Sequence, residues 1–241
     1  MSDGFDVVSV INAKGGAGKT SLTKVLISAA LAAGQDVVAF DADPTQNLMG
    51  WIERAKKAGN WPANAKGFKA STMVQIVDAL NSLIEADFEG MVFVDTAGFG
   101  DEASLYMVNN SDFVVLPIML GADSVDTTME TAKVVMEMVE KLDEESKAVV
   151  KVVRCNIPSQ SSRGKARSEV MDALGQHPLC LQASIRHSAI IELWSDEGPL
   201  HSRFKREKDT KEGAKALNAK NTYTVLQDGL DVINELFEEA D

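Results

Sequence analysis

Glycine and lysine residues cluster near the start of the chain, within residues 12–21. An apolar run precedes this cluster and a helical periodicity follows it, so the cluster must turn sharply between a strand and a helix. Glycine permits such a turn and lets backbone N–H groups approach an anion, which the positive end of the helix also attracts. We therefore expect a phosphate-binding loop, formed by Lys14, Gly15, Gly16, Ala17, Gly18, Lys19, Thr20 and Ser21.

Two side chains of this loop suit a nucleoside triphosphate bound with a metal ion. Lys19 is placed to reach the β- and γ-phosphates, and the hydroxyl of Thr20 is placed to bind Mg²⁺. The common spacing of such loops has glycine at the position of Ala13, and Lys14 follows here as a second lysine. A second cation suits a loop that senses the γ-phosphate.

Carboxylates follow two further apolar runs. Asp41 and Asp43 follow residues 37–40, and Asp95 follows residues 91–94. Phosphoryl transfer needs Mg²⁺ ligands and a group that positions water, and carboxylates at strand ends beside a phosphate loop can supply both. The pattern of four apolar residues and an aspartate predicts that Asp95 holds Mg²⁺ through water.

Strands and helices must bring these groups together. Apolar periodicity typical of helices recurs at 22–30, 73–84 and 125–139. The strands are near-continuously apolar, which indicates a parallel sheet buried on both faces. We predict one domain, 1–241, with a doubly wound α/β fold: a mostly parallel sheet with helices on both faces, as in P-loop NTPases. The predicted strands are 7–11, 37–40, 91–94, 113–117 and 149–153, with a further strand around Cys180.

The two-lysine loop K-G-G-x-G-K-T resembles the deviant Walker A signature of the ParA/MinD superfamily of ATPases. Asp-Ala-Asp-Pro, starting at Asp41, is similar to the D-x-D-P-Q-x-N switch of that family. The resemblance implies that ATP and Mg²⁺ are the cofactors and that the ATP-bound protein is a homodimer. It implies catalytic roles for Lys14, which reaches the partner's nucleotide, for Lys19, and for Asp43, which activates water. It also places Asp41 near hydrated Mg²⁺ and Asn156 beside adenine.

ATP is favoured over GTP because a guanine-selecting motif is missing from the expected place. The K-x-D string at 141–143 lies inside a helical pattern. The three histidines have neither metal-ligand spacing nor a paired nucleophile, so no catalytic role is predicted for them.

Composition excludes several classes of protein. The chain has 241 residues, a net charge of −12 and two cysteines, which excludes a disulfide scaffold and a four-cysteine metal site. The acidic start lacks a secretory signal, and no apolar run approaches the ~18 residues of a membrane span. The segment 221–241 has six acidic residues and no lysine or arginine, unlike a helix that binds anionic lipid. These patterns predict a cytoplasmic protein without membrane insertion, and the resemblance to ParA-like ATPases implies a nucleoid-associated or polar location.

Two basic stretches stand out in the acidic chain. Residues 147–167 contain six basic and no acidic residues, and 203–220 contain seven basic and three acidic residues. Residues 185–192 are similar to a DNA-contacting stretch of ParA-type ATPases, with Ala189 in place of the second arginine. Non-specific DNA binding is therefore expected, and the alternative for 203–220 is a solvated loop. The candidate DNA contacts are Arg186, Arg203, Lys205, Arg206 and Lys208.

The segment 41–62, with Trp51 and Trp61, looks like the ParA-like ATPases of T-DNA and conjugative transfer. The resemblance implies partition or positioning of a DNA element or a large complex, with a ParB-like or transfer-complex protein stimulating slow hydrolysis. Two alternatives are positioning of a protein cluster, or MinD-like regulation, without DNA. A dethiobiotin-synthetase-like ligase is a third alternative, and Lys14 argues against it.

Overall fold

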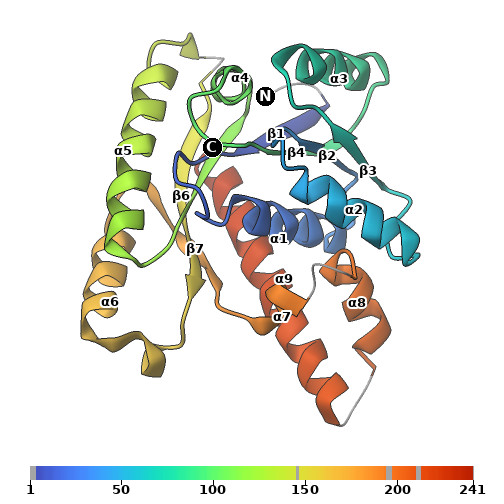
Figure 1. Ribbon diagram of the computed structural model, residues 1–241, viewed down its shortest axis with the longest axis vertical. Coiled ribbons are helices and arrows are strands. Elements are labelled where there is room, and N and C mark those ends of the chain that lie inside the picture. The colour runs from blue at the N-terminus through green and yellow to red at the C-terminus, as the bar shows by residue number, and fades with distance from the viewer. Residues whose placement is uncertain (1–3, 145–146, 194–196, 210–212, 241) are drawn as a thin grey trace.

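The computed structural model describes residues 4–144, 147–193, 197–209 and 213–240 (Figure 1). Their centre is a seven-stranded sheet with the strand order β3-β2-β4-β1-β5-β6-β7. Every strand pairing described is parallel, which confirms the predicted α/β class. The strands are β1 (Phe5–Val10), β2 (Val37–Asp41), β3 (Ala65–Lys69), β4 (Gly90–Asp95), β5 (Phe113–Ile118), β6 (Val149–Ile157) and β7 (Cys180–Arg186).

Helices cover both faces of the sheet (Figure 1). In β1, Val8 and Val10 belong to the core on one face, whereas Val7 belongs to the core on the other. Burial on both faces explains why the central strands are almost continuously apolar. One face carries α1 (Lys19–Ala32), α2 (Asn47–Lys57), α7 (Ala189–Leu193), α8 (Leu200–Glu207) and α9 (Gly213–Glu238), and the other carries α3 (Met73–Glu85), α4 (Glu102–Asn109), α5 (Ala122–Val139) and α6 (Gln160–Gly175).

Helix α1 fixes the end of the glycine-rich loop against the sheet. Its residues Leu22, Val25 and Leu26 are almost completely buried, as the helical periodicity predicted. Gly34 follows the helix with φ +89°, and the N–H of Gln35 donates to the carbonyl of Ala30 at 3.0 Å. A glycine in this left-handed conformation is a common end of a helix.

Helix α9 packs against α1 and β7, so the acidic C-terminal segment belongs to the core of the fold. Its carboxylates also cover the open edge of β7. Glu235 accepts hydrogen bonds from the N–H groups of Gln182 at 2.6 Å and Ala183 at 2.7 Å. These contacts satisfy backbone donors that an uncovered edge strand would expose.

None of the helices that the structure describes is long and apolar enough to cross a membrane.

Candidate nucleotide-binding site

The glycine-rich loop joins β1 to α1 at the carboxyl edge of the sheet. Gly16 has φ +74° and Gly18 has φ +92°, conformations that glycine adopts readily and other residues rarely adopt. A Cβ atom added at Gly16 would meet no atom within 4 Å, so the loop faces open space. This conformation leaves the loop able to present backbone N–H groups to a phosphate group.

Asn12 anchors the loop to the neighbouring strand and helix. This residue is completely buried, and its Nδ2 donates to the carbonyl of Pro117 and to Oγ1 of Thr128, both at 2.9 Å. Its Oδ1 accepts the N–H of Lys14 at 2.9 Å. Sequence reasoning missed Asn12, although a polar residue directly after a buried strand was a usable signal.

Replacing Asn12 by alanine is expected to lower the free energy of unfolding by about 3 kcal/mol. The change leaves the buried carbonyl of Pro117, the buried hydroxyl of Thr128 and the partly buried N–H of Lys14 without their partner, and each buried group costs about 1–3 kcal/mol. Urea unfolding followed by circular dichroism measures the difference. Asn81→Ala, at an exposed position on α3, is the matched control. Equal stabilities of the two variants would contradict this role for Asn12.

Lys19 lies beneath the loop with its ammonium group only weakly engaged. The residue is 8% exposed, and Nζ donates to the carbonyl of Asn12 at 3.4 Å. Burial lowers the pKa of Lys19, while the nearby charges of Asp95, Asp43 and Asp101 oppose that change. A buried cation with one long hydrogen bond is available to a phosphate oxygen.

Asp95 and Asp41 are neighbours because β2 and β4 pair in register at these two residues. Asp95 is completely buried, and its Oδ2 accepts the hydroxyl of Thr20 at 2.6 Å. Burial raises the pKa of Asp95 to about 7; the hydrogen bond from Thr20 opposes this rise, and the charge of Asp41 adds to it. Burial also raises the pKa of Asp41. A divalent cation beside these oxygens would favour their ionised forms.

The donor set fits Mg²⁺ better than a metal held only by protein. Within the described ranges, no group of three or more His, Cys, Asp or Glu side chains could hold a metal ion. Mg²⁺ usually keeps several waters and binds one or two carboxylates together with phosphate oxygens. Thr20 and Asp95 provide a hydroxyl and a carboxylate in contact with each other, which suits such a site.

The turn after β2 orients Asp43. Asp43 Oδ1 accepts hydrogen bonds from the N–H of Thr45 at 2.8 Å and from its hydroxyl at 2.7 Å. Asp41 shapes the same turn, because its two carboxylate oxygens accept the N–H groups of Asp43 at 3.1 Å and Met49 at 2.8 Å. The predicted switch segment is therefore a hydrogen-bonded turn that leads into α2.

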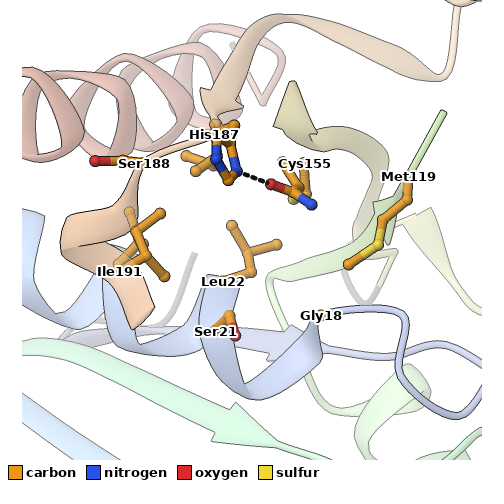
Figure 2. Close-up of a pocket in the computed structure, with 11 residues that line it drawn as sticks. Gly18, Ser21, Leu22, Met119, Cys155, His187, Ser188 and Ile191 are labelled. Atoms are coloured by element: carbon orange, nitrogen blue, oxygen red, sulfur yellow. Dashed lines mark hydrogen bonds between the residues drawn. The ribbon is translucent and has the colours of Figure 1, made fainter. Parts of the chain in front are cut away.

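A cavity of about 210 Å³ lies beside the loop (Figure 2). Asn156, at the end of β6, lines this cavity, and its Oδ1 is 2.7 Å from Nδ1 of His187. The structure thus brings the predicted adenine-side residue next to the phosphate loop. Sequence reasoning did not predict His187, which lies far from Asn156 in the chain. The cavity is lined by Gly18, Ser21, Leu22, Val25, Met119, Cys155, Asn156, Ile185, His187, Ser188 and Ile191.

The two lysines of the loop have different surroundings. Lys19 is buried, whereas Lys14 is half-buried and lines a second, more open cavity together with Gly16. No hydrogen bond or ion pair links the Lys14 ammonium to any described residue. The ammonium group of Lys14 is therefore available to a ligand.

Three of the predicted DNA contacts are engaged within the protein. Arg186 Nε donates to both carboxylate oxygens of Asp228, at 2.9 and 3.0 Å, although its side chain is 57% exposed. Arg206 donates to Oδ1 of Asn60 at 2.6 Å and forms an ion pair with Glu197 at 3.3 Å. Of these three arginines, Arg203 differs most from the prediction, because a contact with DNA requires an exposed side chain. Its side chain is 10% exposed and pairs with Glu197 at 3.7 Å and Glu207 at 3.3 Å.

The first basic stretch, 147–167, does not form one surface either. Lys151 has an 11% exposed side chain and pairs with Glu239 at 2.6 Å. Arg154 is buried and donates to the carbonyls of Leu181 at 2.9 Å and Gln182 at 2.6 Å. Residues 210–212 of the second basic stretch lie outside the described residues. Lys205 and Lys208 are exposed, and no described residue forms an ion pair with either.

The fold and the site together define a class of protein. A parallel sheet carries a two-lysine phosphate loop after β1, and carboxylates lie at the ends of β2 and β4. This combination is that of a P-loop ATPase of the ParA/MinD type, as the sequence predicted.

Comparison with known proteins gives the family. The VirC1 protein family model matches residues 5–240, so the chain belongs to the VirC1 protein family. Protein virC1 of Rhizobium radiobacter is 28% identical over 192 residues, 78% of this chain and 79% of the relative. Protein ParA of the same organism is 28% identical over 138 residues, 57% of this chain and 59% of the relative. The septum site-determining protein MinD of Pyrococcus horikoshii, complexed with Mg-ADP, has a TM-score of 0.59 at 17% identity, covering 92% of this chain and 95% of that chain.

Proposed function

We propose that the protein is an ATP- and Mg²⁺-dependent ATPase that dimerises when ATP is bound and separates after slow hydrolysis. Its role is to partition or position a DNA element or a large complex. The observation that carries the proposal is the pair of lysines on one loop. Lys19 is buried beneath the loop, whereas Lys14 has no acceptor among the residues described and lines an open cavity.

Each group of the site has a task in this proposal. The loop from Gly15 to Ser21 binds the phosphates through backbone N–H groups, and Lys19 neutralises their charge. Thr20 and Asp95 hold Mg²⁺, with Asp41 beside them, and Mg²⁺ would neutralise charge on the phosphates when bound. Asp43 positions the attacking water, which the turn held by Thr45 supports.

Lys14 links nucleotide binding to dimerisation. One lysine already lies under the loop, so we assign the second lysine on the same loop to the phosphates of another subunit. In the proposed dimer, the ammonium of Lys14 contacts the phosphates bound by the partner subunit. This separates the proposal from a metabolic ligase, which needs the loop but has no need of a cation directed to another subunit.

We propose that the ATP-bound dimer binds DNA without sequence preference. Lys205 lies on α8, and Lys208 follows that helix directly. Their spacing of three residues places them on one side of the molecule. Both side chains are exposed. Arg186 and Arg206 can contribute the exposed parts of their guanidinium groups. The buried, doubly paired Arg203 supports the shape of α8, and we assign it no phosphate contact.

Replacing Lys205 and Lys208 together by alanine is expected to weaken binding to a random-sequence duplex and to flatten its salt dependence. Each lysine that contacts a phosphate contributes about 1 to the slope of log affinity against log salt. The measurement is fluorescence anisotropy across a salt series, with ATP and with ADP, in the Asp43→Ala background. The variant Lys133→Ala/Lys141→Ala removes the same charge on the α5 side as the control.

We expect the protein to bind DNA with ATP and not with ADP. We also expect only the α8 substitutions to reduce the slope of log affinity against log salt. Equal slopes for the two double variants would remove α8 from the proposed DNA surface. Absence of DNA binding in both nucleotides would favour the second candidate function, positioning of a protein cluster without DNA.

We also propose a stimulating protein partner, either ParB-like or part of a transfer complex. The proposed location of this protein is the cytoplasm, at the nucleoid or the cell pole. A MinD-like attachment through the C-terminus is disfavoured by α9. Leu226 and Ile233 of that helix are buried in the core, and the C-terminal part of the helix exposes the carboxylates of Asp231, Glu238 and Glu239.

A further inference from the structure

The cavity beside the phosphate loop has the size and walls of a site for one flat ring system. Its volume of about 210 Å³ is below the ~300 Å³ at which pockets for whole drug-sized ligands begin. Leu22 and Val25 of α1 lie in the lining with Ile185 and Ile191, and together they give it apolar walls. This cavity therefore suits the base of a nucleotide whose phosphates occupy the loop.

The polar groups of the cavity come from two adjacent strand ends. Asn156 lies at the end of β6 with φ +56°, and His187 follows β7 directly. The backbone N–H of His187 donates to the carbonyl of Ile157 at 2.8 Å, which ties the two strand ends together. The side chains then meet, with Nδ1 of His187 2.7 Å from Oδ1 of Asn156. The dashed line beside His187 in Figure 2 marks this contact.

This contact couples the hydrogen-bonding roles of the two side chains, so that one donor and one acceptor are left over. An amide oxygen can only accept, so Nδ1 of His187 carries the hydrogen and Nε2 is left as an acceptor. In this arrangement Nδ2 of Asn156 remains as a donor. With the amide and the tautomer both reversed, Nδ2 would donate to Nδ1, and Oδ1 and the Nε2 hydrogen would be left as acceptor and donor instead. No described residue accepts a hydrogen bond from Nδ2 of Asn156. The pair thus offers one donor and one acceptor at the cavity.

We propose that His187 is a positioning residue for base recognition and that the His187–Asn156 pair selects adenine over guanine. Adenine carries the N7 acceptor beside the donor amine on C6, which matches a donor beside an acceptor. Guanine carries two acceptors, N7 and O6, at the same edge, and one of them would face the acceptor of the pair. This inference rests on the proposed function, because it takes ATP as the ligand of the loop.

The test is equilibrium binding of ATP and GTP to the full-length protein, by competition with a fluorescent ATP analogue. His187→Ala is expected to reduce the preference for ATP over GTP about 5- to 150-fold, mostly through weaker ATP binding. His187→Asn restores the preference, because its amide N–H can take the place of Nδ1. His177→Ala is the matched control, since that ring accepts the N–H of Leu179 at 3.2 Å, apart from the cavity.

The outcomes separate this inference from the proposed function. If the wild-type protein prefers ATP and His187→Ala keeps the same ratio at an unchanged melting temperature, the inference is overturned and the proposed function stands. Equal losses of ATP and GTP binding in His187→Ala and His187→Asn would show a purely structural role and would also overturn it. A wild-type protein that binds neither nucleotide would overturn both.

Discussion

Replacing Asp43 by alanine is expected to slow ATP hydrolysis by about 10²–10⁴-fold while ATP binding persists. One carboxylate oxygen of Asp43 accepts both hydrogen bonds from Thr45, and no described residue donates to the other oxygen. That free oxygen can accept a hydrogen bond from the attacking water. Because hydrolysis ends the ATP-bound state, the variant should also accumulate dimers. Phosphate release at saturating ATP measures the rate.

Two further variants separate catalysis from the shape of the turn. Asp43→Asn keeps an oxygen that can accept the hydrogen bonds of Thr45, so it preserves the turn but loses the negative charge. We expect it to be nearly as slow as Asp43→Ala. Asp78→Ala, at an exposed position on α3, removes a carboxylate far along the chain and should hydrolyse ATP normally. Normal hydrolysis by Asp43→Asn would assign to Asp43 a role in the turn alone.

Replacing Lys14 by alanine is expected to abolish dimers at concentrations where the wild-type subunits associate with ATP. Loss of one partner from a buried, charge-assisted contact costs about 2–5 kcal/mol of association free energy. ATP binding to the monomer should change little, because Lys19 and the loop amides remain. Light scattering after gel filtration measures the mass, and nucleotide competition measures the affinity.

Lys57→Ala is the control for this experiment, because it removes one exposed positive charge from α2. It should dimerise with ATP as the wild-type protein does. If Lys14→Ala forms ATP-dependent dimers as readily as Lys57→Ala, the proposed contact between Lys14 and the partner's nucleotide is wrong. If Lys14→Ala loses ATP binding altogether, Lys14 acts within its own subunit.

Much of the fold could be predicted from the sequence because its central strands are buried on both faces. Residues 91–94 and 113–117 have the apolar runs that such burial requires, and both lie within observed strands. The edge strand β3 was not predicted. Its sequence, Ala-Lys-Gly-Phe-Lys, is mostly exposed and therefore lacks an apolar run.

The candidate site was predicted in part, because its components follow the strands along the chain. The phosphate loop and the aspartates are local patterns, and strand pairing then brings Asp41 and Asp95 side by side. Contacts between distant segments could not be predicted. The hydrogen bond between Asn156 and His187 depends on how β6 and β7 pair, and that pairing has irregular register.

Charge patterns in the sequence were less informative than the motifs. A run of basic residues does not show which side chains have acidic neighbours in the fold. Arg203 is buried between Glu197 and Glu207, and Arg186 is paired with Asp228 from a distant part of α9. The basic surface available to a partner is therefore smaller than the sequence indicates.

In the proposed mechanism, ATP switches this protein from monomer to dimer. Sedimentation velocity of the Asp43→Ala protein with saturating ATP and Mg²⁺, compared with ADP and Mg²⁺, tests this claim most directly. We predict a dimer in ATP, a monomer in ADP, and a monomer in both nucleotides when Lys14→Ala is added. A monomer with ATP, or the same dimer with ATP and ADP, would contradict the claim.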